Sequence, residues 1–270
     1  MASTNEIAAL LIDCQDRART LPPITRSDSS FDVERAYEVL ALINARREAQ
    51  GWRRVGRKIG FTNRTIWQRY GVYQPMWAPV WTTSVHFAAN GRAKLPLAGF
   101  VQPRIEPEVL FRLSASPPVT DEPRKLLDCV ESIAASFEIV HSVFPEWKFA
   151  AADCTAASGL HGALVVGAPI ALTTQNRPAF VERLPIFELT LARDGMVVER
   201  GVGSNVLGSP INALAHLVRL LAGQPQFSPL GSGELVTTGT VTDAWPVSAG
   251  ETWTSNYGVL GLDGLSLEFA

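Results

Sequence analysis

The first fifty residues carry apolar side chains at helical spacing. From residue 5 to residue 18 these side chains recur three or four positions apart, so they share one face of a helix. A second helix is predicted to begin after Asp32, whose side chain can cap a helix N-terminus, and to continue to Gln50 before Gly51 ends it. The pattern therefore predicts a helical N-terminal region over residues 1–51.

Beyond Gly51 the chain changes to short apolar or alternating runs separated by Pro and Gly, a pattern typical of strands and turns. Strands are predicted at Val55–Phe61, Glu108–Leu113, Ser136–His141, Ala163–Leu172, Phe187–Leu191, Met196–Glu199, Leu235–Thr240, Thr252–Tyr257 and Leu265–Phe269. Helices are predicted at Arg64–Arg69, Arg124–Ser132 and Ile211–Leu221. Residues 52–270 are thus predicted to form a mainly β domain, and the fold class is α+β.

Composition narrows the function classes. Of the 270 residues, 46% are hydrophobic and 19% charged, which is enough apolar content for a large buried core. A formal net charge of −2 gives no electrostatic attraction for nucleic acid or an anionic membrane, so neither is an expected partner. No apolar stretch approaches the roughly 18 residues of a membrane-spanning helix, and the first residues lack the pattern of a signal peptide.

The cysteines and histidines argue against disulfide and zinc chemistry. Cys14, Cys129 and Cys154 are an odd, widely spaced set without a C-x-x-C pair, which favours a reducing cytoplasm. The four histidines show neither H-x-x-x-H nor H-E-x-x-H spacing.

Three glutamates carry the strongest chemical signal. Glu106 and Glu108 are two residues apart, so on a strand their side chains point to the same side. Glu138 interrupts an apolar run that otherwise fits a buried strand, where an ionised carboxylate needs a partner. Carboxylate oxygens suit a hard cation, so a Mg²⁺ or Mn²⁺ site is predicted. The alternative is an exposed strand face for the pair and a buried ion pair for Glu138.

Lys58 is a candidate acid or base. It lies between Gly56 and Gly60 in a strand-like run, and glycine allows another backbone to approach closely. A lysine near carboxylates can transfer protons or bind an acidic substrate. The simpler alternative is a solvated lysine among other basic residues of an exposed strand.

Two further segments hold candidate substrate-binding residues. The segment Asp153–Gly162 is rich in small residues and is predicted to be a loop in which Ser158 and His161 offer hydrogen-bond donors. An ordinary loop with a structural histidine is the alternative. Trp77 and Trp81 are candidates for an apolar pocket wall, although core packing is the more usual role of tryptophan.

Six motifs follow one another in a recognisable order. They are Gly56–Thr62 (G-R-K-I-G-F-T), Gly71–Pro75 (G-V-Y-Q-P), Glu106–Glu108 (E-P-E), Phe137–Val140 (F-E-I-V), Leu207–Ala213 (L-G-S-P-I-N-A) and Gly233–Thr240 (G-E-L-V-T-T-G-T). Together they resemble the fumarylacetoacetate hydrolase superfamily, and within it the branch of 2-keto-4-pentenoate hydratases and 4-oxalocrotonate decarboxylases. The resemblance extends from about residue 35 to the C-terminus.

This resemblance implies a mixed β-roll with peripheral helices, a homo-oligomer that in some relatives associates with a pathway neighbour, and a role in aromatic catabolism. It also implies one Mg²⁺ or Mn²⁺ held by Glu106, Glu108 and Glu138 and chelated by a small 2-oxo acid substrate. Lys58 would move the proton in dienol–ketone interconversion. Thr240, which ends the last motif, is a candidate substrate-binding residue.

The chain departs from the family where water is handled. Met76 stands where hydratases carry an acidic residue, Ala78 replaces a glycine, and His141 replaces an aspartate. The segment Asp153–Gly162 lacks the family's Asp-Asn pair. His161 is a candidate substitute acid or base near neutral pH.

Four hypotheses follow. The leading one is a metal-dependent lyase that hydrates a 2-oxo acid or its 2-hydroxydienoate enol. The alternative is a decarboxylase of a 2-oxo-enedioate, a reaction that needs the metal but no positioned water, because Met76 replaces the acidic residue. A C–C hydrolase is disfavoured, since no acidic residue lies between His86 and Glu106, where such enzymes place a His–Glu pair. A non-catalytic paralogue is the fourth.

Overall fold

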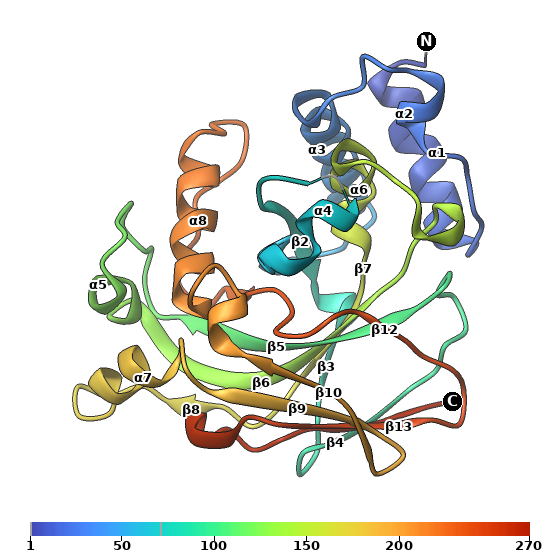
Figure 1. Ribbon diagram of the computed structural model, residues 1–270. Helices are drawn as coiled ribbons and strands as arrows, with labels where there is room; N and C mark the ends of the chain where they lie inside the picture. Colours follow the sequence, from blue (N-terminus) through green and yellow to red (C-terminus); the bar gives the residue numbers. More distant parts are fainter. Residues whose placement is uncertain (1, 71) are drawn as a thin grey trace.

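Two long antiparallel strands, β5 (Arg104–Leu113) and β6 (Val130–Val140), run through the centre of the protein (Figure 1). They belong to a computed structural model that describes residues 2–70 and 72–270. The larger sheet contains, in spatial order, β2 (Met76–Trp81), β1 (Arg54–Gly60), β11 (Leu235–Thr237), β5, β6, β7 (His161–Val166) and β3 (Val85–Phe87), while β12 (Trp245–Pro246) also pairs with β5 and β8 (Ile170–Ala171) with β6. The second sheet contains β10 (Met196–Val202), β9 (Glu188–Arg193), β13 (Thr252–Asn256), β14 (Ser266–Phe269) and β4 (Arg92–Leu95).

The N-terminal helices α1 (Thr4–Asp16), α2 (Ile24–Ser27) and α3 (Val33–Ala49) gather at one end of the molecule with α6 (Ala151–Ala156) (Figure 1). Ser3 and Glu6 form a capping box at the start of α1, and Asp32 caps α3 as predicted. The apolar faces of these helices share a buried cluster with side chains from residues 140–160. The predicted boundary at residue 51 lies between α3 and β1. The buried cluster contains side chains from both sides of this boundary.

Four other helices border the sheets. They are α4 (Trp67–Tyr70), α5 (Pro123–Leu127), α7 (Arg177–Arg183) and α8 (Pro210–Ala222). Helix α8 begins with Pro210 and has Gly223 as its C-cap. The N–H groups of a first helical turn have no partner within the helix, so proline, which has no N–H, fits at this position. Curled sheets with peripheral helices and a helical N-terminal region confirm the predicted α+β fold (Figure 1). Within the described ranges, no helix has the length and apolar character needed to cross a membrane.

Two sequence predictions about local structure are wrong. The helix predicted at Arg124–Ser132 ends at Leu127, and β6 begins at Val130. The loop predicted at Asp153–Gly162 is instead the end of α6, a 3-10 turn at Ser158–Leu160 and the start of β7. Gly71, which opens the Gly71–Pro75 motif, lies outside the described residues.

The strand β2 escaped prediction for a physical reason. All its residues are buried, so it shows no alternation of polar and apolar side chains, and Pro79 lies inside it. Proline cannot donate a ladder hydrogen bond and is therefore tolerated mainly on edge strands. The position of β2 at the end of the sheet satisfies that condition.

Gly56 allows two strands of the larger sheet to pair. The strand β1 runs parallel to β11 with Gly56 opposite Leu235, and a Cβ atom on Gly56 would lie 2.1 Å from the Leu235 carbonyl oxygen. The predicted close backbone approach is therefore confirmed at this glycine.

Replacing Gly56 with alanine is expected to destabilise the protein by at least about 2 kcal/mol, because the atom in the way belongs to a paired backbone and cannot rotate aside. Gly231→Ala is the matched control, since a Cβ at that glycine would meet no atom within 4 Å. Thermal denaturation followed by circular dichroism would compare the two. Equal melting temperatures for G56A and G231A would contradict this account of the β1–β11 pair.

Candidate metal centre

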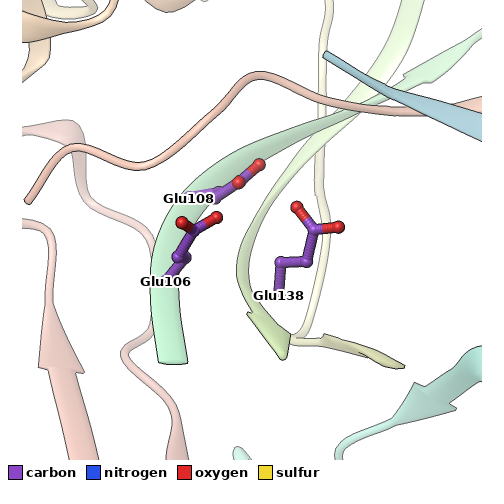
Figure 2. Close-up of side chains that lie close together, drawn as sticks. All are labelled: Glu106, Glu108 and Glu138. Atoms are coloured by element: carbon purple, nitrogen blue, oxygen red, sulfur yellow. The ribbon is translucent and has the colours of Figure 1, made fainter. Parts of the chain in front are cut away.

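The pairing of β5 with β6 brings three carboxylates together. Glu106 lies directly opposite Glu138 in the antiparallel register, and Glu108 follows on the same side of β5. One carboxylate oxygen from each residue lies within 4.8 Å of the others. Figure 2 shows Glu106 and Glu108 on one strand and Glu138 on the neighbouring strand, with their carboxylates extending into the same region.

A break in strand pairing lies beside this cluster. On the other edge of β5, β12 pairs with residues 104–105 and β11 with residues 110–112. The segment between them turns at Gly239, whose φ of +92° is readily adopted by glycine. The N–H of Gly239 donates to Glu108 Oε2 over 2.9 Å. The Gly233–Thr240 motif thus supplies a backbone donor to one of the three carboxylates.

The cluster has the electrostatics of a cation site. Burial, with repulsion from Glu138 and Glu106, raises the pKa of Glu108 well above its usual range. Burial also raises the pKa of Glu106, to about 7. Glu108 Oε1 is buried and has no hydrogen-bond partner among the residues that the structure describes. A hard divalent cation with oxygen ligands would satisfy this oxygen and relieve the repulsion, so the residues present fit Mg²⁺ or Mn²⁺.

Lys58 is the buried counter-charge. Its side chain is 5% exposed, its Nζ lies 3.1 Å from Glu138 Oε2, and it donates to the carbonyl oxygen of Gly159 over 3.0 Å. Burial alone would lower the pKa of Lys58, but the three carboxylates outweigh it and raise the pKa above its ordinary value. The alternative of a solvated strand lysine is therefore wrong.

Glu138 is the carboxylate that stays ionised most readily. Burial raises its pKa, but the charges of Lys58 and His161 and their hydrogen bonds more than offset this, and the pKa falls to about 2. The cluster therefore combines one firmly ionised carboxylate with two that need a further positive charge.

A pocket lies beside the cluster. Lys58, Glu106 and the predicted substrate residue Thr240 all line it. Its other polar lining residues include Asn63, Thr62, Arg104 and Asp243, and its apolar lining residues include Met76, Phe61, Trp147, Phe149 and Leu160. The pocket thus brings the predicted proton-transfer residue Lys58 together with Glu106, one of the three predicted metal ligands.

Two other predicted site residues line a different cavity. His161 and Ser158 border it together with Ser84 and His141. His161 Nδ1 lies 2.8 Å from Glu138 Oε1, and its Nε2 lies 2.8 Å from Ser84 Oγ. His161 therefore touches the carboxylate cluster but does not border the pocket that contains Lys58.

Trp77 is not brought to the site. It is fully buried, stacks against Tyr37 and donates from Nε1 to Gln224 Oε1 over 2.6 Å. The role observed is core packing, and the neighbouring Met76 is the residue of β2 that lines the pocket.

Arg104 and Asp243 are pocket residues that the sequence analysis did not single out. Arg104 is two positions before Glu106 on the same strand, so strand periodicity alone places the two on one side. The Arg104 guanidinium lies 4.1 Å from the centre of the Trp147 ring. Asp243 follows β11 in an irregular segment, where no periodicity gives its direction.

Comparison with known proteins gives the family. No protein-family model matches the chain. A 2-hydroxyhexa-2,4-dienoate hydratase from Comamonas testosteroni is 32% identical over 238 residues, which cover 87% of this chain and 86% of the relative. A 4-oxalocrotonate decarboxylase from a Pseudomonas species is 32% identical over 240 residues, 89% of this chain and 88% of the relative. The chain belongs to the hydratase and decarboxylase branch of the fumarylacetoacetate hydrolase superfamily.

A solved structure supports the same fold. The 4-oxalocrotonate decarboxylase from Pseudomonas putida G7, complexed with magnesium and adipate, matches with a TM-score of 0.87 at 23% identity. The match covers 99% of this chain and 97% of that protein. The predicted membership of the hydratase and decarboxylase branch is thus confirmed by sequence and by fold.

His141 gives a prediction for the pH dependence of stability. Its Nδ1 accepts the Val101 N–H over 3.3 Å, and burial lowers its pKa from 6.5 to about 4. Between these values the unfolded chain binds a proton at this position that the folded chain does not. The contribution of His141 to stability is therefore lost as the pH falls from 6.5 towards 4.

The His141→Asn variant keeps a hydrogen-bond acceptor and removes the ionisable group. Between pH 7 and pH 4, wild type should lose roughly 3 kcal/mol more unfolding free energy than this variant. Urea denaturation across that range measures the difference. Parallel stability profiles for the two proteins would show that His141 does not titrate as described.

Proposed function

We propose that this protein is a divalent-metal-dependent lyase acting on a 2-oxo acid or its 2-hydroxydienoate enol. The observation that carries the proposal is the convergence of Lys58 and the three carboxylates beside one pocket. Glu106, Glu108 and Glu138 would hold Mg²⁺ or Mn²⁺. When bound, such an ion supplies a Lewis acid that stabilises negative charge on a neighbouring substrate oxygen.

Lys58 is the proton-transfer residue in this proposal. Gly159 and Glu138 fix its ammonium group at the pocket wall, and an ammonium has three N–H donors. One donor therefore remains for a bound substrate. Lys58 would donate a proton to the carbon end of the conjugated system while the enol hydroxyl loses its proton, which gives the ketone, and would take the carbon proton back in the reverse step.

Hydration is the first candidate for the step that follows. Water would add to one carbon of the remaining double bond while a proton adds to its neighbour. The pocket offers Asp243, Asn63 and Thr62 as polar groups that can hold a water molecule. The similarity to a 2-hydroxyhexa-2,4-dienoate hydratase supports this candidate.

Decarboxylation of a 2-oxo-enedioate is the second candidate, and Met76 and Arg104 favour it. Met76 gives the pocket an apolar side chain where hydratases carry an acidic residue. Arg104 adds a positive charge two residues from Glu106, about 6.8 Å along the strand, which suits a second substrate carboxylate. The similar decarboxylase of known structure was crystallised with adipate, a dicarboxylate.

A cytoplasmic homo-oligomer is part of the same proposal. The location is supported by the cysteines, since Cys14, Cys129 and Cys154 are all free thiols. The oligomer and an association with a pathway neighbour are supported by the family resemblance. The expected partner in the pocket is a small 2-oxo acid.

A paired turnover assay tests the proposal. Mg²⁺-loaded protein receives freshly generated 2-hydroxypenta-2,4-dienoate or 2-oxo-hex-3-enedioate, and loss of the chromophore and release of CO₂ are followed. Hydration of the monoacid without CO₂ would support the first candidate, and CO₂ from the diacid would support the second. Lys58→Met should lower either activity by about 10²-fold or more, because proton transfer is lost.

Lys94→Met is the matched control, because Lys94 is also a strand lysine but its side chain is 61% exposed. This variant should keep wild-type turnover. Absence of turnover with both substrates, in protein shown to bind Mg²⁺, would overturn the lyase proposal. Full activity of the Lys58 variant would overturn the role of Lys58.

A further inference from the structure

The two oxygens of Glu138 are held by two different cationic or polar side chains. His161 Nδ1 lies 2.8 Å from Oε1, and Lys58 Nζ lies 3.1 Å from Oε2. Glu108 receives the Gly239 N–H on Oε2 and, among the described residues, has no charged side chain paired with its Oε1. Glu108 Oε1 and Glu138 Oε2 both lack a hydrogen-bond partner in the described part of the chain, so Lys58 meets Glu138 Oε2 as an ion pair. Glu138 is therefore oriented by a hydrogen bond at one oxygen and an ion pair at the other.

The His161 imidazole, which contacts Glu138 Oε1, has a second partner at its other ring nitrogen. His161 Nε2 lies 2.8 Å from Ser84 Oγ, and the Ser84 hydroxyl lies 3.0 Å from the Trp81 carbonyl oxygen. The His161 side chain is only 4% exposed. Since both ring nitrogens have a partner, rotation of the ring would break a hydrogen bond in a buried place, which is costly.

His161 lies behind Glu138 and outside the lining of the Lys58 pocket. His161 borders the second cavity, which it shares with Ser84, Ser158 and His141, and it is not among the residues that line the pocket beside Lys58. The contact between His161 and the proposed reaction site passes through Glu138. This geometry does not support the expectation from the sequence that His161 is an acid or base toward substrate.

We propose that His161 is a positioning residue that fixes the Glu138 carboxylate in its metal-binding orientation, and that Ser84 fixes His161 in turn. The inference rests on the proposed metal site at Glu106, Glu108 and Glu138. Outer partners of metal ligands orient the ligand and commonly change metal affinity by about 10–100-fold. The second cavity borders this imidazole, and the Lys58 pocket does not.

Calorimetric titration of metal-free protein with Mg²⁺ or Mn²⁺ tests the proposal without turnover. His161→Ala should weaken binding by about 10–100-fold. His161→Asn places an N–H donor where Nδ1 was and should bind within about threefold of wild type, as hydrogen bonding to Glu138 is kept. The metal affinity of Ser84→Ala should lie between those of His161→Ala and His161→Asn. His86→Ala, at an exposed histidine of β3, is the control and should not change affinity.

Added imidazole provides a second readout. Because His161 borders an open cavity, free imidazole can enter the space left in H161A and should restore part of the Mg²⁺ affinity. It should have no effect on Glu138→Gln, where the ligand itself is changed. Turnover of H161A should recover at saturating Mg²⁺, since a positioning residue acts through affinity.

Three results would overturn the inference, and they are distinguishable. Wild-type metal affinity in H161A, with affinity lost in E138Q, would remove the role of His161 and leave the metal site standing. A low kcat of H161A that persists at saturating Mg²⁺ would make His161 a direct participant in the chemistry. Failure of the wild-type protein to bind Mg²⁺ or Mn²⁺ would remove the metal site, and the inference with it.

Discussion

The antiparallel register of β5 and β6 is the constraint on which the rest of the site depends. It sets Glu106 opposite Glu138 and leaves Glu108 on the same side, inside a region where carboxylates are costly to bury. With all groups ionised, three carboxylates and one ammonium leave two negative charges, which a divalent cation neutralises. The burial of Lys58 and the donor from Gly239 lower the cost of this arrangement without removing it.

Two cavities with different lining residues lie near the carboxylate cluster. The pocket beside Lys58 is lined by Lys58, Glu106, Arg104 and a group of apolar side chains. The second cavity is bordered by His161, which contacts Glu138, and by Ser84, which contacts His161. A carboxylate oriented from a separate cavity can keep its orientation when residues of the Lys58 pocket change.

The sequence was sufficient for the centre of the site because burial and strand periodicity both pointed to it. Few structures explain a carboxylate within an apolar run together with two carboxylates that are two residues apart. Strand periodicity would also have placed Arg104 on the same side as Glu106. The placement of Trp77 and Met76 could not be predicted in this way, because β2 is buried on both faces. Its sequence does not tell which of the two neighbours faces the pocket.

The second cavity was beyond the sequence for a different reason. His161, His141 and Ser84 come from segments that only tertiary folding brings together, and the segment predicted as a loop is partly α6. The helix predicted across Arg124–Ser132 failed because apolar spacing in a short segment does not separate a helix from a strand buried on both sides.

The most direct test of the central claim is an anomalous diffraction map from crystals of this protein loaded with Mn²⁺. The account predicts a peak roughly 2.0–2.6 Å from a carboxylate oxygen of each of Glu106, Glu108 and Glu138. A peak held by other residues, or no peak between β5 and β6 at saturating Mn²⁺, would contradict it.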